Sequence, residues 1–229
     1  MDILAPERDS APVLPPPILP WGAALPAQPA RRTGDVAPPA HPPAAVVVVP
    51  VPPGHVRSLK SVLSSLAASR TAGGLPAAPG ALAVLILAAD PEALSIAEAT
   101  APDYPFPLRV EAGPGDAVLA IRRAGAWATA LGAPGAPVLI ADRGQPVSPR
   151  WAYDLLCALR DGADLVTRRA GVFERLLGGP VPPVALSGRA QWAMERWSSG
   201  GLARRGAAWT ERDSPWRRPA RAGLRAVAA

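Results

Sequence analysis

The sequence predicts an α/β domain built on a mostly parallel, doubly wound sheet flanked by helices, with a disordered, proline-rich tail in front of it. Two observations predict this class. Unbroken apolar runs, typical of strands buried on both faces, alternate with segments whose apolar residues recur every three or four positions. The alternation extends from residue 45 to about residue 170 and implies right-handed crossovers between parallel strands. We therefore expect a tail over residues 1–44 and one domain over residues 45–229.

The tail is predicted from its proline content. Residues 1–44 contain twelve prolines and few periodic apolar positions. Proline has no N–H for a helix or a strand ladder, so this segment is expected to be disordered or polyproline-like. Its "PPPILP" has the spacing of a ligand for a proline-reading domain, although a passive tail is the simpler interpretation.

The domain is expected to open with a strand in "AAVVVVPVPP", residues 44–53, because consecutive valines are stiff at χ1 and suit a buried sheet. A helix follows, and the Gly- and Pro-rich segment 71–80 ends it. The apolar residues of that helix recur at spacings of three and four: Val56, Leu59, Val62, Leu63 and Leu66.

The remaining elements continue the alternation. The predicted strands are 81–90, 107–112, 136–142 and 163–170, with a further short one at 183–188. The predicted helices are 91–101, about 116–131, and 149–162, the last ended by Asp161-Gly162. In such sheets ligands bind outside the carboxyl ends of the strands, which is where Asp90 and Asp142 fall.

Composition excludes several classes of site. The net charge of +6 favours anionic partners such as nucleotides, phosphates or membrane surfaces. A single cysteine, Cys157, excludes a disulfide framework and a cysteine metal cluster and fits a reducing, cytoplasmic setting. Two histidines leave little for zinc or Ser-His-Asp chemistry. No apolar run reaches the roughly 18 residues that span a bilayer, so we expect a soluble protein, compatible with a peripheral contact at the inner face of the plasma membrane.

The longest structured stretch carries one acid where a buried strand ends. It reads "VLIADRGQPVSPRWAYDLLCALRDGADLV", residues 138–166, and contains Asp142. Together with "VVVVPVPPGHVRSLKSVLSSLAAS" and "IRRAG" earlier in the chain, this stretch resembles the family 2 glycosyltransferases, which have the GT-A fold. The resemblance covers about residues 44–228. It implies an inverting transferase that moves a sugar from a nucleotide-diphosphate donor to a hydroxyl acceptor.

The resemblance also implies a donor site. In the family, an Asp-x-Asp pair holds Mg²⁺ or Mn²⁺ at the donor diphosphate. Here Asp142 matches the second acid and Ile140 replaces the first, so a metal would rest on Asp142 alone, and Arg143 offers a direct positive charge instead. The further donor-binding residues implied are Pro50, Val51, Asp90, Arg122 and Arg123.

The end of the chain carries the implied catalytic base. "ERDSPWRRPARAGLRAV" resembles the family segment whose Asp deprotonates the acceptor hydroxyl. Glu211 matches, Arg212 replaces the usual Asp, and Asp213 is the nearest substitute, so Asp213 or Glu211 is the expected general base. Trp192 and Trp197 would suit stacking on an acceptor sugar or a lipid, although packing is the commoner role.

Several of these residues also have simpler interpretations that involve no ligand. Asp90 before Pro91 suits a helix cap, and Arg122 and Arg123 suit the solvated face of a helix. A second hypothesis is a GT-A-like binding or scaffold protein without catalysis, because five motif positions depart from the family. A third is a basic module whose arginines of residues 204–225 meet anionic lipid; nucleic acid is not expected, because no base-reading pattern is present. A lipid-linked acceptor with peripheral membrane contact is compatible with the first hypothesis.

Overall fold

The described part of the protein is an α/β domain. The computed structural model describes residues 41–51, 54–88, 90–112, 117–141, 145–167, 183–202, 219 and 223–228. The chain divides into two units, Met1–Ala30 and Arg31–Ala229, and every described residue belongs to the second. The predicted tail over residues 1–44 therefore lies almost entirely outside the described residues.

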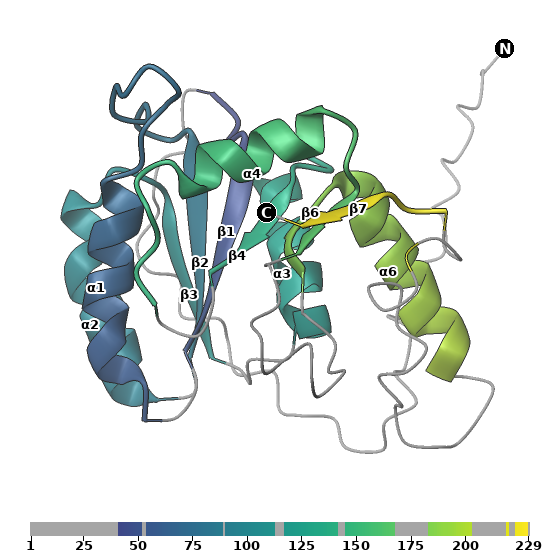
Figure 1. The fold of residues 1–229 in the computed structure, drawn as a ribbon. Helices are drawn as coiled ribbons and strands as arrows, with labels where there is room; N and C mark the ends of the chain where they lie inside the picture. The colour runs from purple at the N-terminus through teal and green to yellow at the C-terminus, as the bar shows by residue number, and fades with distance from the viewer. Residues whose placement is uncertain are drawn as a thin grey trace, which may run out of the picture. The chain divides into compact units, whose positions relative to one another are not determined.

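Within the described residues seven strands form one sheet in the order β3-β2-β1-β4-β6-β5-β7 (Figure 1). Six strands run in one direction, and β6 runs against its neighbours β4 and β5. The strands are β1 Ala45–Val51, β2 Leu82–Ala88, β3 Leu108–Ala112, β4 Val138–Ile140, β5 Leu165–Thr167, β6 Pro183–Leu186 and β7 Ala226–Ala228. The expected mostly parallel sheet is confirmed.

Helices cover both faces of this sheet (Figure 1). Side chains alternate between the faces of a strand. In β1, Val47 and Val49 pack with α1, α2 and α4, whereas Val46 and Val48 pack with α3 and α6. The unbroken valine run is thus buried on both sides, as a doubly wound sheet requires. The helices are α1 Val56–Ala67, α2 Pro91–Thr100, α3 Ala117–Ala130, α4 Trp151–Arg160 and α6 Gly188–Leu202, with a 3₁₀ turn, η1, at Ala101–Asp103.

The ends of two helices follow from local chemistry. Asp90 caps α2: its carboxylate accepts a hydrogen bond from the backbone N–H of Glu92 at 2.9 Å, and Pro91 occupies the first turn. Gly162, with φ of +93°, follows the last turn of α4 in the left-handed region that glycine tolerates. Both signals were readable in the sequence. None of the helices within the described residues combines the length and apolar character needed to cross a bilayer.

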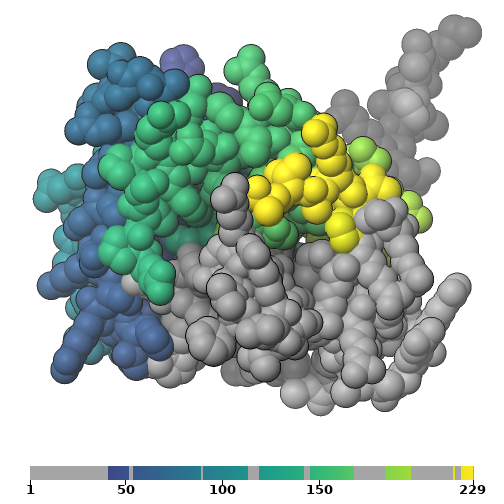
Figure 2. Space-filling view, in the orientation of Figure 1, coloured from purple at the N-terminus to yellow at the C-terminus, as the bar shows by residue number. Residues whose placement is uncertain are grey.

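At the end of the sheet formed by β6, β5 and β7, strands and helices no longer simply alternate. β6 enters between β4 and β5 as an antiparallel strand, and the three-residue β7 pairs with β5 in parallel. The sequence analysis predicted no strand at β7. On the face shown in Figure 2, α4 and the C-terminal segment lie side by side, and Arg225 donates to the backbone oxygen of Asp161 at 3.3 Å there.

Candidate functional site

The strand order reverses between β1 and β4, and we call the region outside the carboxyl ends of these two strands the crevice. From β1 the chain winds outward to β2 and β3, and then returns to place β4 on the other side of β1. The carboxyl ends of β1 and β4 are therefore neighbours at the point where the strand order reverses, where ligands bind in doubly wound sheets. The backbone N–H of Ala141 donates to the oxygen of Val48 at 2.9 Å, which fixes the end of β4 against β1.

Pro50 and Val51 form the β1 side of this crevice. Val46 and Val48 both hydrogen-bond toward β4, each at 2.9 Å, so by alternation the backbone of Pro50 faces the same side. β4 pairs with β1 only as far as Ile140, opposite Val48. A proline is tolerated at position 50 because no ladder bond with β4 is required there. Pro50 is half-buried, whereas Val51 is buried in the core, so Val51 could offer a ligand only its backbone.

The donor-binding acid expected on the β4 side of the crevice is known from the sequence alone. Asp142 directly follows Ala141, but both Asp142 and Arg143 lie outside the described residues. The same holds for the expected base, Asp213 or Glu211. Their roles stay predictions.

The resemblance implies acids at positions 88, 89 and 140, and the two of these that the structure describes are apolar. Ala88, at the end of β2, is completely buried. Ile140 is half-buried and packs against the core shared by α3 and α6. Neither side chain can hold a base or a metal, and Asp90, beyond Ala88, already caps α2.

Arg123 is held away from the crevice. Its Nη1 donates to the backbone oxygen of Ala112 at 2.9 Å, and its Nε lies 3.3 Å from Glu111 Oε2. Glu111 also pairs with Arg109 at 2.7 Å. These contacts tie Arg123 to the end of edge strand β3, two strands from β1 and three from β4. Arg122, the preceding residue on α3, is exposed. The structure therefore separates two arginines that the sequence analysis treated alike.

A surface hollow of about 300 Å³ lies elsewhere. Its lining includes Lys60, Ser64, Asp103 and Tyr104. Residues 103–105 precede β3, and Pro105 accepts a hydrogen bond from Gly80, which precedes β2. The hollow is thus at the amino-terminal edge of the sheet, opposite the crevice, and is not the expected donor site.

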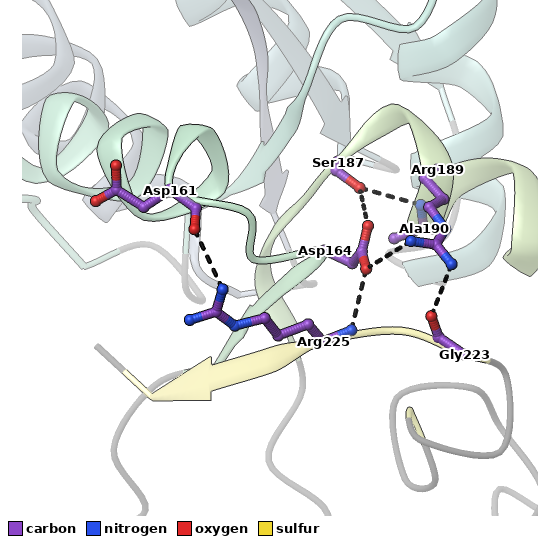
Figure 3. A network of polar contacts seen from close by, with 7 residues as sticks. All are labelled: Asp161, Asp164, Ser187, Arg189, Ala190, Gly223 and Arg225. Atoms are coloured by element: carbon purple, nitrogen blue, oxygen red, sulfur yellow. Dashed lines mark hydrogen bonds and ion pairs between the residues drawn. The ribbon is translucent and has the colours of Figure 1, made fainter.

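The amino-terminal edge also holds a polar network that the sequence analysis did not find (Figure 3). At its centre is Asp164, which is only 8% exposed. Its carboxylate accepts from Ser187 Oγ at 3.1 Å and from the backbone N–H of Arg225 at 3.0 Å, and it lies 3.7 Å from Arg189 Nη1. Arg189 also donates to the oxygen of Gly223 at 2.9 Å.

This network is structural. It joins the residues before β5, the start of α6 and the residues before β7, all at the edge opposite the crevice. Ser187 also caps α6 by accepting from the N–H of Ala190 at 3.2 Å. The "DGADLV" at the end of residues 138–166 therefore has an explanation in folding alone. The signal in the sequence was Asp164 directly ahead of an apolar strand, but its partners are distant in the chain.

Solved structures include chains that are similar to this one in fold, and S. aureus TarS is among them. No family model matches the chain, and no curated protein matches it in sequence. The chain is similar to residues 1–349 of S. aureus TarS, in a crystal structure with UDP, at a TM-score of 0.41 and 14% sequence identity. The match covers 56% of this chain and 35% of that chain, so the chain spans about a third of that structure's length.

Proposed function

We propose that the protein is a glycosyltransferase that moves a sugar from a nucleotide-diphosphate donor to a hydroxyl acceptor, with the donor at the carboxyl ends of β1 and β4. The observation that supports this most is the reversal of the strand order between β1 and β4, because Asp142 follows β4 closely in the sequence. The resemblance of residues 138–166 to family 2 glycosyltransferases adds the reaction class.

The reaction is proposed as a single displacement with inversion at the sugar carbon. The acceptor oxygen forms the new bond, the nucleoside diphosphate leaves, and the acceptor proton passes to Asp213 or Glu211. Arg122 and Arg143 neutralise the diphosphate, whose negative charge grows as the bond to the sugar breaks. Arg123 acts as a positioning residue, because its contacts with Glu111 and Ala112 hold α3 against β3.

The side chains available as metal ligands at the proposed site suit a divalent cation poorly. Mg²⁺ and Mn²⁺ prefer several carboxylate oxygens, and Asp142 is the one acid that the Asp-x-Asp position retains, since Ile140 is apolar. Within the ranges that the structure describes, no three acidic, histidine or cysteine side chains are grouped as metal ligands. We therefore propose that donor binding depends on arginine more than on Mg²⁺ or Mn²⁺, and any ion at Asp142 would be weakly held.

The experiment is isothermal titration of the full chain with UDP, GDP and their sugar conjugates, with and without Mn²⁺. Binding of one nucleotide is expected, with a modest effect of Mn²⁺. Asp142→Asn is expected to change the affinity. Asp154→Asn is the matched control, because Asp154 is exposed on α4, where it lies 3.2 Å from Arg150 Nη2. Absence of binding to every nucleotide tested contradicts the proposal.

A second candidate is a binding or scaffold protein that keeps the nucleotide crevice without catalysis. The observation that favours it is the apolar character of Ala88 and Ile140, where the family has acids. The two candidates differ in one result. Sugar transfer by the wild type that is lost in Asp213→Asn or Glu211→Gln supports the enzyme. Nucleotide binding accompanied by neither sugar transfer nor hydrolysis of the donor supports the scaffold.

The acceptor and the place of action belong to the same proposal. A lipid-linked hydroxyl acceptor would require the protein to work at the inner face of the plasma membrane, as a cytoplasmic protein in peripheral contact with it. The net charge of +6 supports an attraction to an anionic membrane surface. Nucleic acid is not proposed as a partner.

A further inference from the structure

The hollow beside Lys60 and Tyr104 lies between two neighbouring helices at the amino-terminal edge of the sheet. Helices α1 and α2 lie side by side (Figure 1). Some of the lining residues belong to the second half of α1, and the others to the end of α2 and the residues that follow it. The volume of about 300 Å³ is at the small end of the range of about 300 to 1,000 Å³ that ligand pockets occupy. The hollow can therefore hold a small molecule.

The lining of the hollow carries one charge of each sign. Lys60 and Asp103 are its charged residues, and both are exposed. Within the part of the chain that the structure describes, neither side chain belongs to an ion pair or a hydrogen bond. The two formal charges cancel, so the lining is complementary to a ligand that is neutral overall and carries both charges.

The α1 side of the hollow offers hydrogen-bond donors. Lys60 and Ser64 are four residues apart on α1 and therefore lie on the same face of the helix. The ammonium group of Lys60 can only donate, and the exposed Ser64 has no side-chain partner among the described residues, so its hydroxyl is available to donate as well. A carboxylate suits this side, because hydrogen bonds between an ammonium group and a carboxylate are charge-assisted.

The opposite side of the hollow offers acceptors. Thr100 donates its hydroxyl proton to the backbone oxygen of Ile96 at 2.8 Å, and Tyr104 donates its own to that of Leu63 at 2.9 Å. Both hydroxyl oxygens can therefore only accept a further hydrogen bond, and Asp103 adds a carboxylate. Thr100 is also the last residue of α2, and the carboxyl end of a helix carries a partial negative charge. An ammonium group suits this side.

We propose that the hollow binds a small zwitterion, a free amino acid with an apolar side chain. The carboxylate of this ligand pairs with Lys60 and Ser64, and its ammonium group pairs with Asp103. The apolar side chain of the ligand contacts the apolar part of the lining, which includes Ala67 and Pro105. The proposal does not depend on sugar transfer, because the hollow lies at the edge of the sheet opposite the crevice.

The test is isothermal titration of the full chain with L-leucine and with two analogues that each lack one of its charges. L-leucinamide has no carboxylate, and N-acetyl-L-leucine has no ammonium group. Leucine is expected to bind, and each analogue is expected to bind about fivefold more weakly, because each loses one exposed ion pair. Absence of leucine binding up to the solubility limit, or an analogue that binds as tightly as leucine, overturns the proposal.

Two variants place the ligand in the hollow. Lys60→Gln is expected to weaken leucine binding about fivefold and to leave the affinity for leucinamide unchanged, whereas Asp103→Asn does the same for leucine and spares N-acetyl-leucine. Both side chains are exposed, so the unfolding midpoints of these variants are expected to match that of the wild type.

The matched controls are Arg57→Gln on α1 and Glu98→Gln on α2, which remove the same charges from exposed positions outside the lining. Both are expected to bind leucine as the wild type does. Wild-type affinity in Lys60→Gln and Asp103→Asn, or equal losses in the controls, overturns the proposal. So does displacement of leucine by UDP, because the amino acid would then occupy the nucleotide site.

Discussion

The carboxylate of Asp164 lies 3.0 Å from the backbone nitrogen of Arg225, which comes 61 residues later in the chain. This bond, with the pairing of the Arg225 oxygen to the N–H groups of Asp164 and Leu165 at 2.7 and 3.1 Å, holds the C-terminal segment beside β5. The far end of the sheet thus depends on one buried carboxylate.

We expect Asp164→Ala to destabilise the protein by about 2–3 kcal/mol, because it leaves the partly buried N–H of Arg225 and hydroxyl of Ser187 without their charged acceptor. Urea unfolding followed by circular dichroism measures this. Ser187→Ala, which removes one hydrogen bond to the carboxylate and the α6 cap, is expected to cost less, about 1–2 kcal/mol. Equal stability of Asp164→Ala and wild type would show that the network does not hold the segment.

Gly188, the first residue of α6, lies against the backbone of Gly135. A Cβ at this position would lie 2.6 Å from the backbone oxygen of Gly135. Gly188→Ala is therefore expected to destabilise by about 1–3 kcal/mol, because one of the two backbones must move. Gly125→Ala on α3 is the control: its Cβ would meet only the Gln191 side chain, at 3.4 Å, and the gain in helix propensity is expected to make it neutral or slightly stabilising. Thermal unfolding of both variants distinguishes them.

Tyr104 makes stability depend on alkaline pH. Its hydroxyl donates to the backbone oxygen of Leu63 at 2.9 Å, and burial raises its pKa above the usual value of 10.0. The folded state holds this proton more tightly than the unfolded state does. The contribution is therefore complete below pH 10 and is lost progressively as pH rises above it.

Tyr104→Phe is expected to cost about 1 kcal/mol at neutral pH through the lost hydrogen bond and to flatten the decline above pH 10. Urea unfolding free energies on both sides of that pH measure the change in slope. Tyr153→Phe on α4 is the comparison, because the hydrogen bond to Cys157 also raises the pKa of Tyr153, whereas burial is the cause at Tyr104; the two variants therefore show how much of the slope comes from each tyrosine. If Tyr104→Phe leaves the decline of the unfolding free energy above pH 10 unchanged, the Tyr104 hydroxyl is not the cause of that decline.

The two arginines of α3 are expected to behave differently. Arg123→Gln removes the bond to Ala112 and the ion pair with Glu111; because Arg123 is partly exposed, the expected cost in stability is about 1 kcal/mol. Arg122→Gln is expected to weaken binding of a nucleoside diphosphate more than Arg123→Gln does. Titration of both variants with the same nucleotide gives the comparison, and the reverse order would place the phosphate at β3 instead.

Local sequence patterns predicted the alternating strands and helices of the first part of the domain well. The run Val46–Val49 indicated a strand buried on both faces, and the leucine spacing of α1 indicated its core side; both are confirmed. β7 was missed because three residues carry no readable period, and its place depends on Asp164, a contact between residues distant in the chain. Asp90 was readable as a cap because Pro91 follows it, and this cap is confirmed.

The donor site was predictable only in outline. Alternation implied parallel strands whose carboxyl ends share one edge, but the reversal of the order between β1 and β4 came from the structure. Sequence could not separate Arg122 from Arg123, because the difference arises from Glu111 on a strand brought close by folding. The roles of Asp142 and Asp213 remain predictions that need a bound ligand.

The most direct test is a crystal structure of the full chain with UDP. The account predicts the diphosphate in the crevice between the carboxyl ends of β1 and β4, within hydrogen-bond reach of Asp142 or its neighbours and of Arg122. UDP bound at the amino-terminal edge, for example in the hollow beside Lys60 and Tyr104, would contradict it, and so would a saturating soak that leaves the crevice empty.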